Sequence, residues 1–248
     1  MRPRAVVTGA ARRVGAAIAV ELAAAGYDLV LHWRDTSAED TAVRCRALGA
    51  EVALVRADLG TVEGVQAVID AVCARFEALE LLVHNASTFS WASFDDTTAE
   101  HLDAMMAIHA RAPLLLSRGL LDRLRHGQMP GAPEGQHGVV VHLCDVGADR
   151  PVRGYTAYSM SKAALVMLVK SMAVELAPAI RTVGISPGQV AWPDDYDADR
   201  RDRLLRRIPM GRVGDPEDVA RLVRFVAAEG HYLNGAIVPV DGGLSTRY

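Results

Sequence analysis

The feature that most constrains the fold is a regular alternation of short aliphatic runs with longer helical patterns along the whole chain. Short runs of β-branched and aliphatic residues indicate buried strands, and apolar residues at helical spacing indicate helices. Strands that alternate with helices in this way pair in parallel. The sequence predicts strands at 5–8, 28–33, 51–56, 81–84, 139–144, 182–186 and 236–240, and helices at 14–25, 38–48, 62–76, 99–125, 158–175 and 216–228.

Seven strands with intervening helices predict one α/β domain over residues 1–248. Its expected architecture is a single Rossmann-type, doubly wound, parallel seven-stranded sheet with helices on both faces. A chain of 248 residues, half of them hydrophobic, is long enough and apolar enough to bury such a core. Ligand sites are then expected beyond the carboxyl ends of the strands.

The bulk composition narrows the possible partners. A formal net charge of −3 gives no overall attraction to nucleic acid or to anionic lipid. The three cysteines are widely spaced and lack CxxC or histidine-rich neighbours, which favours reduced thiols over zinc or disulfides and indicates a cytoplasmic protein. No apolar stretch approaches the length of a membrane span and no secretory leader is recognisable, so we expect a protein without metal, membrane or nucleic-acid partners.

Two segments interrupt the alternation. Residues 127–138 are rich in glycine and proline and predict a surface loop. Residues 192–212 combine acidic residues with an arginine-rich helical stretch at 200–207, and within them 194–212 form a candidate lid over a substrate. A solvated, charged helix without such a role is the alternative.

A glycine-containing turn connects the first predicted strand to the first helix. Glycines at this point permit a tight turn and allow a phosphate to approach the amides at the start of the helix, where the helix dipole favours negative charge. A strand–turn–helix connection without a ligand is the alternative. The residues predicted to bind a cofactor pyrophosphate are Thr8, Gly9, Arg12, Arg13, Val14 and Gly15.

The end of the second strand carries a cation. In NAD-specific sites a carboxylate here binds the ribose 2′-hydroxyl, whereas Arg34 suits a 2′-phosphate, so the sequence favours NADP. Asp35 follows directly and weakens this inference, and an Arg34 that only points into water is the alternative. His32 and Trp33 precede it and are expected to line the same site.

The ends of the third and fifth strands carry carboxylates. Asp58, with Leu59, is placed to accept from an adenine amino group, or to cap the next helix. Asp145 follows the fifth strand, where catalytic residues of such sheets gather.

One tyrosine–lysine pair stands out. Tyr158 and Lys162 are four residues apart at the start of a predicted helix and share one face, so the ammonium can stabilise a phenolate and make the phenol an acid near neutral pH. Only two residues of the chain, Lys162 and Lys170, are lysines, which makes an accidental pairing less probable. An ordinary surface pair is the alternative.

These motifs together resemble the short-chain dehydrogenase/reductases. The resemblance covers nearly the whole chain and rests on the glycine turn, on Asn85-Ala86 after the fourth strand, on the Tyr158–Lys162 pair, on Pro187-Gly188 after the sixth strand and on Asp241-Gly-Gly. In most members a serine stands where this chain has Asp145, and a glycine where it has Arg13. Both departures are similar to the pteridine reductases, including the bacterial dihydromonapterin reductases.

That narrower resemblance extends to Asn85-Ala-Ser-Thr-Phe89 and Gly154-Tyr-Thr-Ala-Tyr158. It implies a flat, nitrogen-rich substrate, with the pterin ring stacked on Phe89, Arg13 and Ser87 donating to it, and Asp145 hydrogen-bonded to the Tyr158 phenol. Structural roles for these residues are the alternatives. For the cofactor it implies that Asn85, Ala86, Ser87, Tyr158, Lys162, Pro187 and Gly188 surround the nicotinamide half.

Two further features follow from the resemblance. His109 stands where the family keeps an asparagine of its proton relay, and it either holds the same water or fills the helix. The resemblance also implies a homotetramer, in which Arg247 is expected to reach the site of a neighbouring subunit. The expected activity is NADPH-dependent reduction of a dihydropteridine or dihydrofolate to the tetrahydro form, with Asp145, Tyr158 and Lys162 as catalytic residues. A short-chain carbonyl reductase and a non-catalytic NADP(H) sensor are the alternatives.

Overall fold

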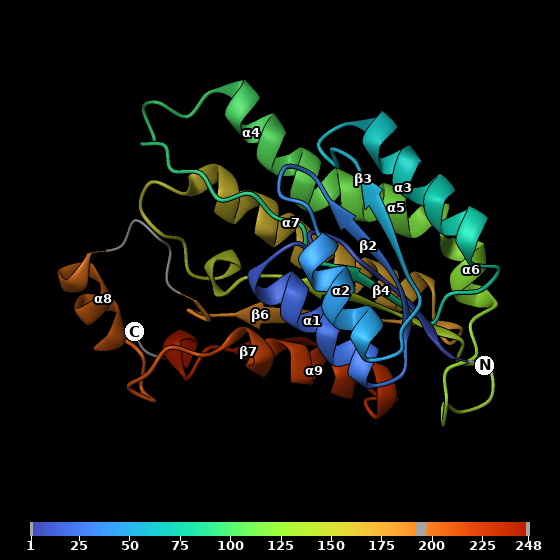
Figure 1. Cartoon of the computed structure of the whole chain (residues 1–248). Coiled ribbons are helices and arrows are strands. Elements are labelled where there is room, and N and C mark those ends of the chain that lie inside the picture. Colours follow the sequence, from blue (N-terminus) through green and yellow to red (C-terminus); the bar gives the residue numbers. More distant parts are fainter. Residues whose placement is uncertain (1, 192–196, 247–248) are drawn as a thin grey trace.

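The computed structural model describes residues 2–191 and 197–246. Its centre is a seven-stranded parallel sheet with the order β3-β2-β1-β4-β5-β6-β7 (Figure 1). The predicted fold class is therefore confirmed. The strands are β1 (Arg4–Val7), β2 (Asp28–Trp33), β3 (Val52–Arg56), β4 (Leu81–His84), β5 (Gly138–Leu143), β6 (Ile180–Pro187) and β7 (Ile237–Val240).

Helices cover both faces of the sheet (Figure 1). They are α1 (Arg13–Ala24), α2 (Glu39–Ala47), α3 (Val62–Arg75), α4 (Ala99–Met106), α5 (Ala112–Gly119), α6 (Leu121–Arg125), α7 (Thr156–Glu175), α8 (Ala198–Leu205) and α9 (Pro216–Ala228), with short helical turns η1 (Ala107–Arg111), η2 (Val146–Ala148) and η3 (Leu244–Thr246). Helices α1, α2 and α9 pack on one face, and α3, α5, α6 and α7 contribute to the core on the other.

The two cores follow from the alternation of side chains along each strand. Val7 of β1 belongs to the core beneath α1 and α9, whereas its neighbour Val6 belongs to the core beneath α3 and α5. Because both faces are buried, the strands are apolar at nearly every position and not only at alternate ones. This is why their sequences read as continuous aliphatic runs.

The long helical region predicted at about 99–125 is confirmed, but it consists of several segments. The chain forms α4, then a π-helical segment η1, then α5 and α6. Pro113 in the first turn of α5 has no N–H to donate to the carbonyl of His109, so the regular hydrogen-bond ladder is broken at that point. The π-helical segment carries His109.

Helix α7 corrects a second expectation. An 18-residue window of this 20-residue helix has a mean hydropathy of 1.2, which makes it the one helix in the described part of the chain that is long and apolar enough to cross a membrane. Half of that window is buried inside the molecule. It packs against the sheet through Leu165 and Val169 and carries Tyr158 and Lys162. We therefore assign it to the protein core.

Candidate active site

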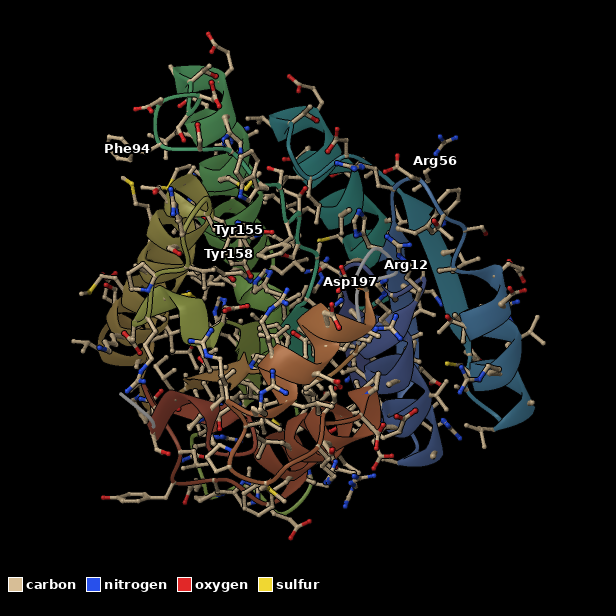
Figure 2. All side chains as sticks on the ribbon, turned by 90° about the vertical axis from the view of Figure 1, so that its left-hand side faces the viewer. Arg12, Arg56, Phe94, Tyr155, Tyr158 and Asp197 are labelled. Atoms are coloured by element: carbon tan, nitrogen blue, oxygen red, sulfur yellow. The ribbon has the colours of Figure 1, made fainter. Side chains whose placement is uncertain are left out.

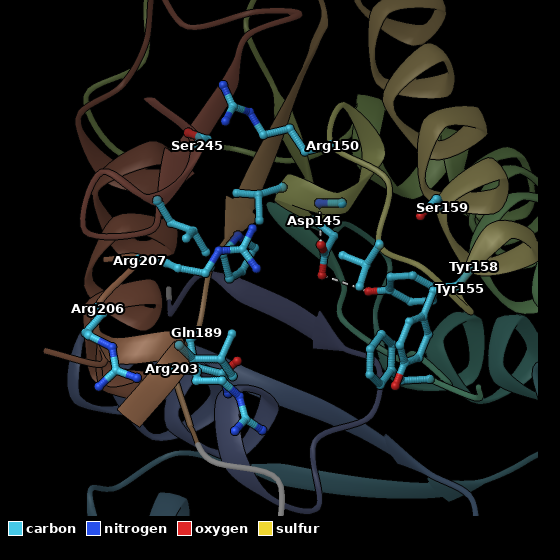
Figure 3. Close-up of a pocket in the computed structure, with 18 residues that line it drawn as sticks. Asp145, Arg150, Tyr155, Tyr158, Ser159, Gln189, Arg203, Arg206, Arg207 and Ser245 are labelled. Atoms are coloured by element: carbon cyan, nitrogen blue, oxygen red, sulfur yellow. Dashed lines mark hydrogen bonds between the residues drawn. The ribbon is translucent and has the colours of Figure 1, made fainter. Parts of the chain in front are cut away.

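A cavity of about 790 Å³ opens beyond the carboxyl ends of the strands, beside η2, the start of α7, and α8. Figure 2 shows the molecule from this side, with Tyr155 and Tyr158 facing the viewer. The volume of the cavity lies within the range of about 300–1,000 Å³ that is usual for small-molecule sites. The residues that form its wall and are labelled in Figure 3 are Asp145, Arg150, Tyr155, Tyr158, Ser159, Gln189, Arg203, Arg206, Arg207 and Ser245.

The centre of this cavity is a carboxylate–phenol pair. The Tyr158 hydroxyl donates to Oδ2 of Asp145 over 2.8 Å (Figure 3). Oδ1 of Asp145 accepts the backbone N–H of Gly147 at 2.6 Å, which fixes the carboxylate at the start of η2. The expected hydrogen bond is thus present, and it joins residues from the end of β5 and the first turn of α7.

The pKa of the Tyr158 phenol does not follow the simple expectation. Burial raises this pKa well above its ordinary value, the charge of Asp145 raises it further, and the nearby Ser87 hydroxyl acts in the opposite direction. The expectation that Lys162 makes the phenol more acidic is therefore corrected for this structure. A desolvated phenol beside a carboxylate keeps its proton at neutral pH, so Tyr158 is held in the form that can donate.

Lys162 lies beneath the cavity wall. It is only 3% exposed, and its Nζ donates to the carbonyl of Leu143 at 2.8 Å and lies 5.7 Å from the centre of the Tyr158 ring. Burial lowers the pKa of the ammonium, and the charge of Asp145 partly offsets this. The side chain thus anchors the end of β5 from inside the protein.

His109 lies in the π-helical segment and is hydrogen-bonded at both ring nitrogens. Nδ1 is 2.8 Å from Oγ of Ser161, and Nε2 is 2.8 Å from Oγ of Ser87. Because the Ser161 hydroxyl donates to the carbonyl of Tyr158 and the N–H of Thr88 points at Nε2, we assign the proton of the ring to Nδ1. Burial and the charge of Lys162 lower the pKa of His109 to about 2, so the ring is neutral.

Aromatic side chains line the cavity next to Tyr158. Phe89 is 54% exposed and stacks on Tyr155 with ring centres 4.2 Å apart and planes at 10°. Its ring also meets the edge of Tyr158 at 4.8 Å. A structural role as a core aromatic is thus excluded, but one face of Phe89 is already covered by Tyr155. The sequence motif Gly154-Tyr-Thr-Ala-Tyr158 contains Tyr155, but the sequence did not indicate that its side chain lines the cavity.

A second, smaller pocket of about 380 Å³ adjoins the first around the turn between β1 and α1. The turn requires glycine at two points: Gly9 has φ +65°, and a Cβ on Gly15 would lie 2.1 Å from the carbonyl oxygen of Gly9. The predicted residues that line this pocket are Gly9, Arg12, Arg13, Val14, Gly15, His32, Trp33, Arg34, Asp58, Leu59, Asn85, Ala86 and Ser87. Pro187 and Gly188 line the larger cavity instead.

Several predicted cofactor residues hold the turn in place. Thr8 is 1% exposed and is absent from the wall of the pocket, and its Oγ1 accepts the N–H groups of Asn85 and Ala86. The Asn85 side chain donates to the carbonyls of Thr8 and Gly9 at 2.9 and 3.0 Å. His32 accepts the Gly9 N–H at Nδ1 and donates to Ala57 from Nε2, which ties β2 and β3 to the turn.

The far end of this pocket carries Arg34. Its guanidinium pairs with Asp35 at 2.7 Å and lies 3.9 Å from Asp58, and both Arg34 and Asp35 are more than half exposed. Such exposed pairs contribute about 0–1 kcal/mol, so a phosphate dianion can displace Asp35. Asp58 accepts the N–H of Gly60, while Thr61 is the residue that caps α3. Asp58 lies in the N-cap region of α3, because its carbonyl accepts the Thr61 hydroxyl, but its carboxylate does not itself cap the helix.

Arg13 occupies an unusual backbone conformation. It is the one non-glycine residue in the described part of the chain with positive φ, at 50°. A side chain in this region costs on the order of 1–2 kcal/mol, which glycine avoids. This strain accounts physically for a glycine at the position in other family members, and it indicates that the arginine has a use here.

The arginine-rich segment lies over the larger cavity. Helix α8 and the residues after it contribute part of the cavity wall, so the described part of the candidate lid, 197–212, borders the site. Residues 194–196 and Arg247 lie outside the described residues. Their proposed roles stay predictions.

Comparison with known protein families gives one match that spans almost the whole chain. A family model described as enoyl-(acyl carrier protein) reductase matches residues 9–245. Pteridine reductase 1 of Leishmania tarentolae is 30% identical and covers 98% of this chain and 96% of its own length. L-xylulose reductase of Bos taurus is 33% identical, with 97% and 95% covered.

Solved structures share the same fold. The structure of FolM alternative dihydrofolate reductase 1 from Brucella canis complexed with NADP superposes with a TM-score of 0.88, at 27% identity, over 99% of this chain and 95% of that one. The names of these relatives refer to different substrates. The comparisons therefore support oxidoreductase chemistry for this chain but do not identify its substrate.

Proposed function

The chain belongs to the short-chain dehydrogenase/reductase family of nicotinamide-dependent oxidoreductases, and we propose that it reduces a dihydropteridine to the tetrahydro form with NADPH. The observation that carries the substrate assignment is the hydrogen bond from Tyr158 to Asp145 in the large cavity. Pteridine and dihydrofolate reductases are among the relatives, which supports the same assignment.

Asp145 favours a nitrogen heterocycle over a carbonyl. An ionised carboxylate only accepts hydrogen bonds and repels the negative charge that develops on a carbonyl oxygen during reduction. It does accept from the N–H and amino groups along the edge of a pterin. The serine that most family members have at this position would donate to a carbonyl oxygen instead.

The proposed mechanism assigns the proton to Tyr158. NADPH, when bound, supplies a hydride to a ring carbon of the substrate. Tyr158 donates the proton at its hydroxyl to the adjacent ring nitrogen, so one C=N bond becomes a CH–NH bond, and solvent then returns a proton to the tyrosine. For this transfer the Tyr158 hydroxyl turns from Oδ2 of Asp145 to the ring nitrogen, which leaves Asp145 to accept from the substrate edge. The face of Phe89 that Tyr155 does not cover contacts one face of the substrate ring.

The residues present fit a phosphorylated dinucleotide. The glycine turn leaves space that any Cβ at Gly15 would remove, and it opens at the start of α1, where backbone N–H groups favour an anion. Arg34 stands at the far end of the same pocket and supports NADPH over NADH.

We expect Arg34→Gln to raise KM for NADPH about tenfold and leave KM for NADH nearly unchanged, as measured by initial rates. An equal effect on both cofactors would contradict the NADPH assignment.

The substrate assignment is tested by following NADPH absorbance with dihydrobiopterin, dihydromonapterin, dihydrofolate and an acetoacetyl thioester side by side. We expect turnover with the pteridines and little with the thioester. Asp145→Ser restores the residue type of most family members, so it should lower pteridine turnover more than thioester turnover.

A carbonyl reductase is the second candidate, because the bovine relative is named for reduction of a sugar ketone. Turnover of the thioester or of L-xylulose with inert pteridines would establish it. Tight NADPH binding without oxidation by any of these compounds would instead support a non-catalytic sensor.

A further inference from the structure

The large cavity has an unbalanced charge. Among the described residues that border it, four are arginines, Arg150, Arg203, Arg206 and Arg207, and one, Asp145, is a carboxylate. That carboxylate already accepts from Tyr158 and Gly147. The wall opposite the reacting groups is therefore cationic, although the chain as a whole has a net charge of −3.

Two of these arginines have no acidic partner among the described residues. Within residues 2–191 and 197–246, Arg203 and Arg207 form no ion pair, whereas arginines elsewhere, such as Arg46 and Arg75, pair with nearby glutamates. In Figure 3 the side chain of Arg207 extends toward Asp145 from the opposite side of the cavity, and that of Arg206 points away. Both Arg203 and Arg207 are exposed, which places their charges at the cavity mouth.

Stabilisation of α8 alone does not explain this arrangement. Basic residues at the end of a helix interact favourably with its dipole, and Arg207 follows α8 closely. That interaction does not require a guanidinium to extend into a cavity. The cavity is also larger than a bicyclic ring needs, so a substituent of the ring would extend from Tyr158 toward this cationic mouth.

We propose that Arg207, with Arg203 beside it, binds an anionic group on the side chain of the substrate. The inference rests on the proposed function, because it assumes that the pterin ring lies at Asp145 and Tyr158. It narrows the substrate to a dihydropteridine with a carboxylate or phosphate tail, since a guanidinium forms no ion pair with a neutral polyol side chain.

The test compares substrates that share the ring and differ in the charge of the tail. Initial rates are measured with dihydrobiopterin, which has a neutral side chain, with dihydrofolate, which has two carboxylates, and with dihydroneopterin phosphate. In Arg207→Gln, KM for the preferred anionic substrate should rise about tenfold, while KM for dihydrobiopterin and for NADPH stays within about twofold. The anion with the larger change identifies carboxylate or phosphate as the natural group.

The matched control is Arg44→Gln, which removes the same charge from an exposed position on α2 and should change none of these values. Equal changes for neutral and anionic substrates would overturn the proposal, as would a comparable loss of NADPH affinity or no change at all. In the wild type, higher salt should raise KM for the anionic substrate selectively, because both arginines are exposed.

A binding experiment separates this inference from the proposed function. Calorimetry measures the binding of p-aminobenzoyl-glutamate and of inorganic phosphate, which lack a pterin ring, to the NADP-loaded protein. If no pteridine is reduced but one of these anions binds the wild type and not the Arg203→Gln, Arg207→Gln double variant, the anion site stands and the pteridine assignment falls. If pteridines are reduced with no preference for charge and neither anion binds, the pteridine assignment stands and the anion site falls.

Discussion

At the scale of single residues, the chemistry depends on how Tyr158 is held. Burial and the charge of Asp145 raise the pKa of the phenol, so the residue is protonated at neutral pH. Asp145 and Ser87 reach the phenol from different elements, and His109 positions Ser87 through a hydrogen bond of 2.8 Å. The proposed proton donor is thus held by a small polar network of side chains.

Replacing Tyr158 by Phe should abolish most turnover because it removes the proton donor and leaves the ring stack in place. Binding of NADPH, measured by its fluorescence in the presence of the variant, should change little. Near-normal turnover would reject Tyr158 as the donor and direct attention to Asp145.

His109 predicts a dependence of stability on pH. Its folded-state pKa of about 2 lies far below the ordinary value of 6.5, so below pH 6.5 the unfolded chain binds a proton that the folded chain does not. The contribution to stability is complete above about pH 6.5 and is lost as the pH falls toward 2, by about 2 kcal/mol at pH 5. His109→Asn should remove this part of the slope in urea-unfolding measurements.

The matched control is the same substitution at the exposed His126, which removes a histidine without touching the buried network around His109. If His109→Asn shows the wild-type slope, the ring is not held neutral in the folded protein, and the other buried histidines, His32, His84 and His142, account for the pH dependence.

At the scale of elements, the turn between β1 and α1 combines strain with binding. The two glycines relieve close contacts, but Arg13 keeps a positive φ that a glycine would adopt at no steric cost. The protein retains an arginine where stability favours glycine. This is the pattern expected where backbone strain is tolerated for the sake of a functional group.

Arg13→Gly should therefore affect stability and function in opposite directions. We expect the free energy of unfolding to rise by up to about 1 kcal/mol, because relief of strain exceeds the added freedom of the unfolded chain. The Kd for NADPH, or KM for the pteridine, should increase several-fold. Arg12→Gly is the matched control: Arg12 has φ −156°, so this change should give no stabilisation. A destabilised Arg13→Gly variant would contradict the strain argument.

At the scale of the whole molecule, the outer face of α7 has no cover in a single chain. Met160, Met167 and Val174 recur every seven residues along one side of this helix and are 52%, 59% and 82% exposed. A stripe of this kind is typical of a helix-packed subunit interface. We propose that it forms part of the interface of a homotetramer.

Met167→Glu places a charge in the middle of this stripe and should dissociate the assembly, as measured by light scattering coupled to size-exclusion chromatography. Val43→Glu is the control, because Val43 is equally exposed, at 56%, but lies on α2. A wild-type mass for the Met167 variant would place the interface elsewhere.

The sequence by itself determined the order of strands and helices and the parallel sheet, and it singled out the proposed catalytic residues, because these depend on local periodicity and on short spacings such as Tyr158–Lys162. It did not show the π-helical break at 107–111, the stacking of Tyr155 on Phe89 or the raised pKa of Tyr158. Only the tertiary structure decided these features. Burial, and the approach of Asp145, Ser87 and His109 from three separate elements, depend on distances across the fold, which the order of residues along the chain does not contain.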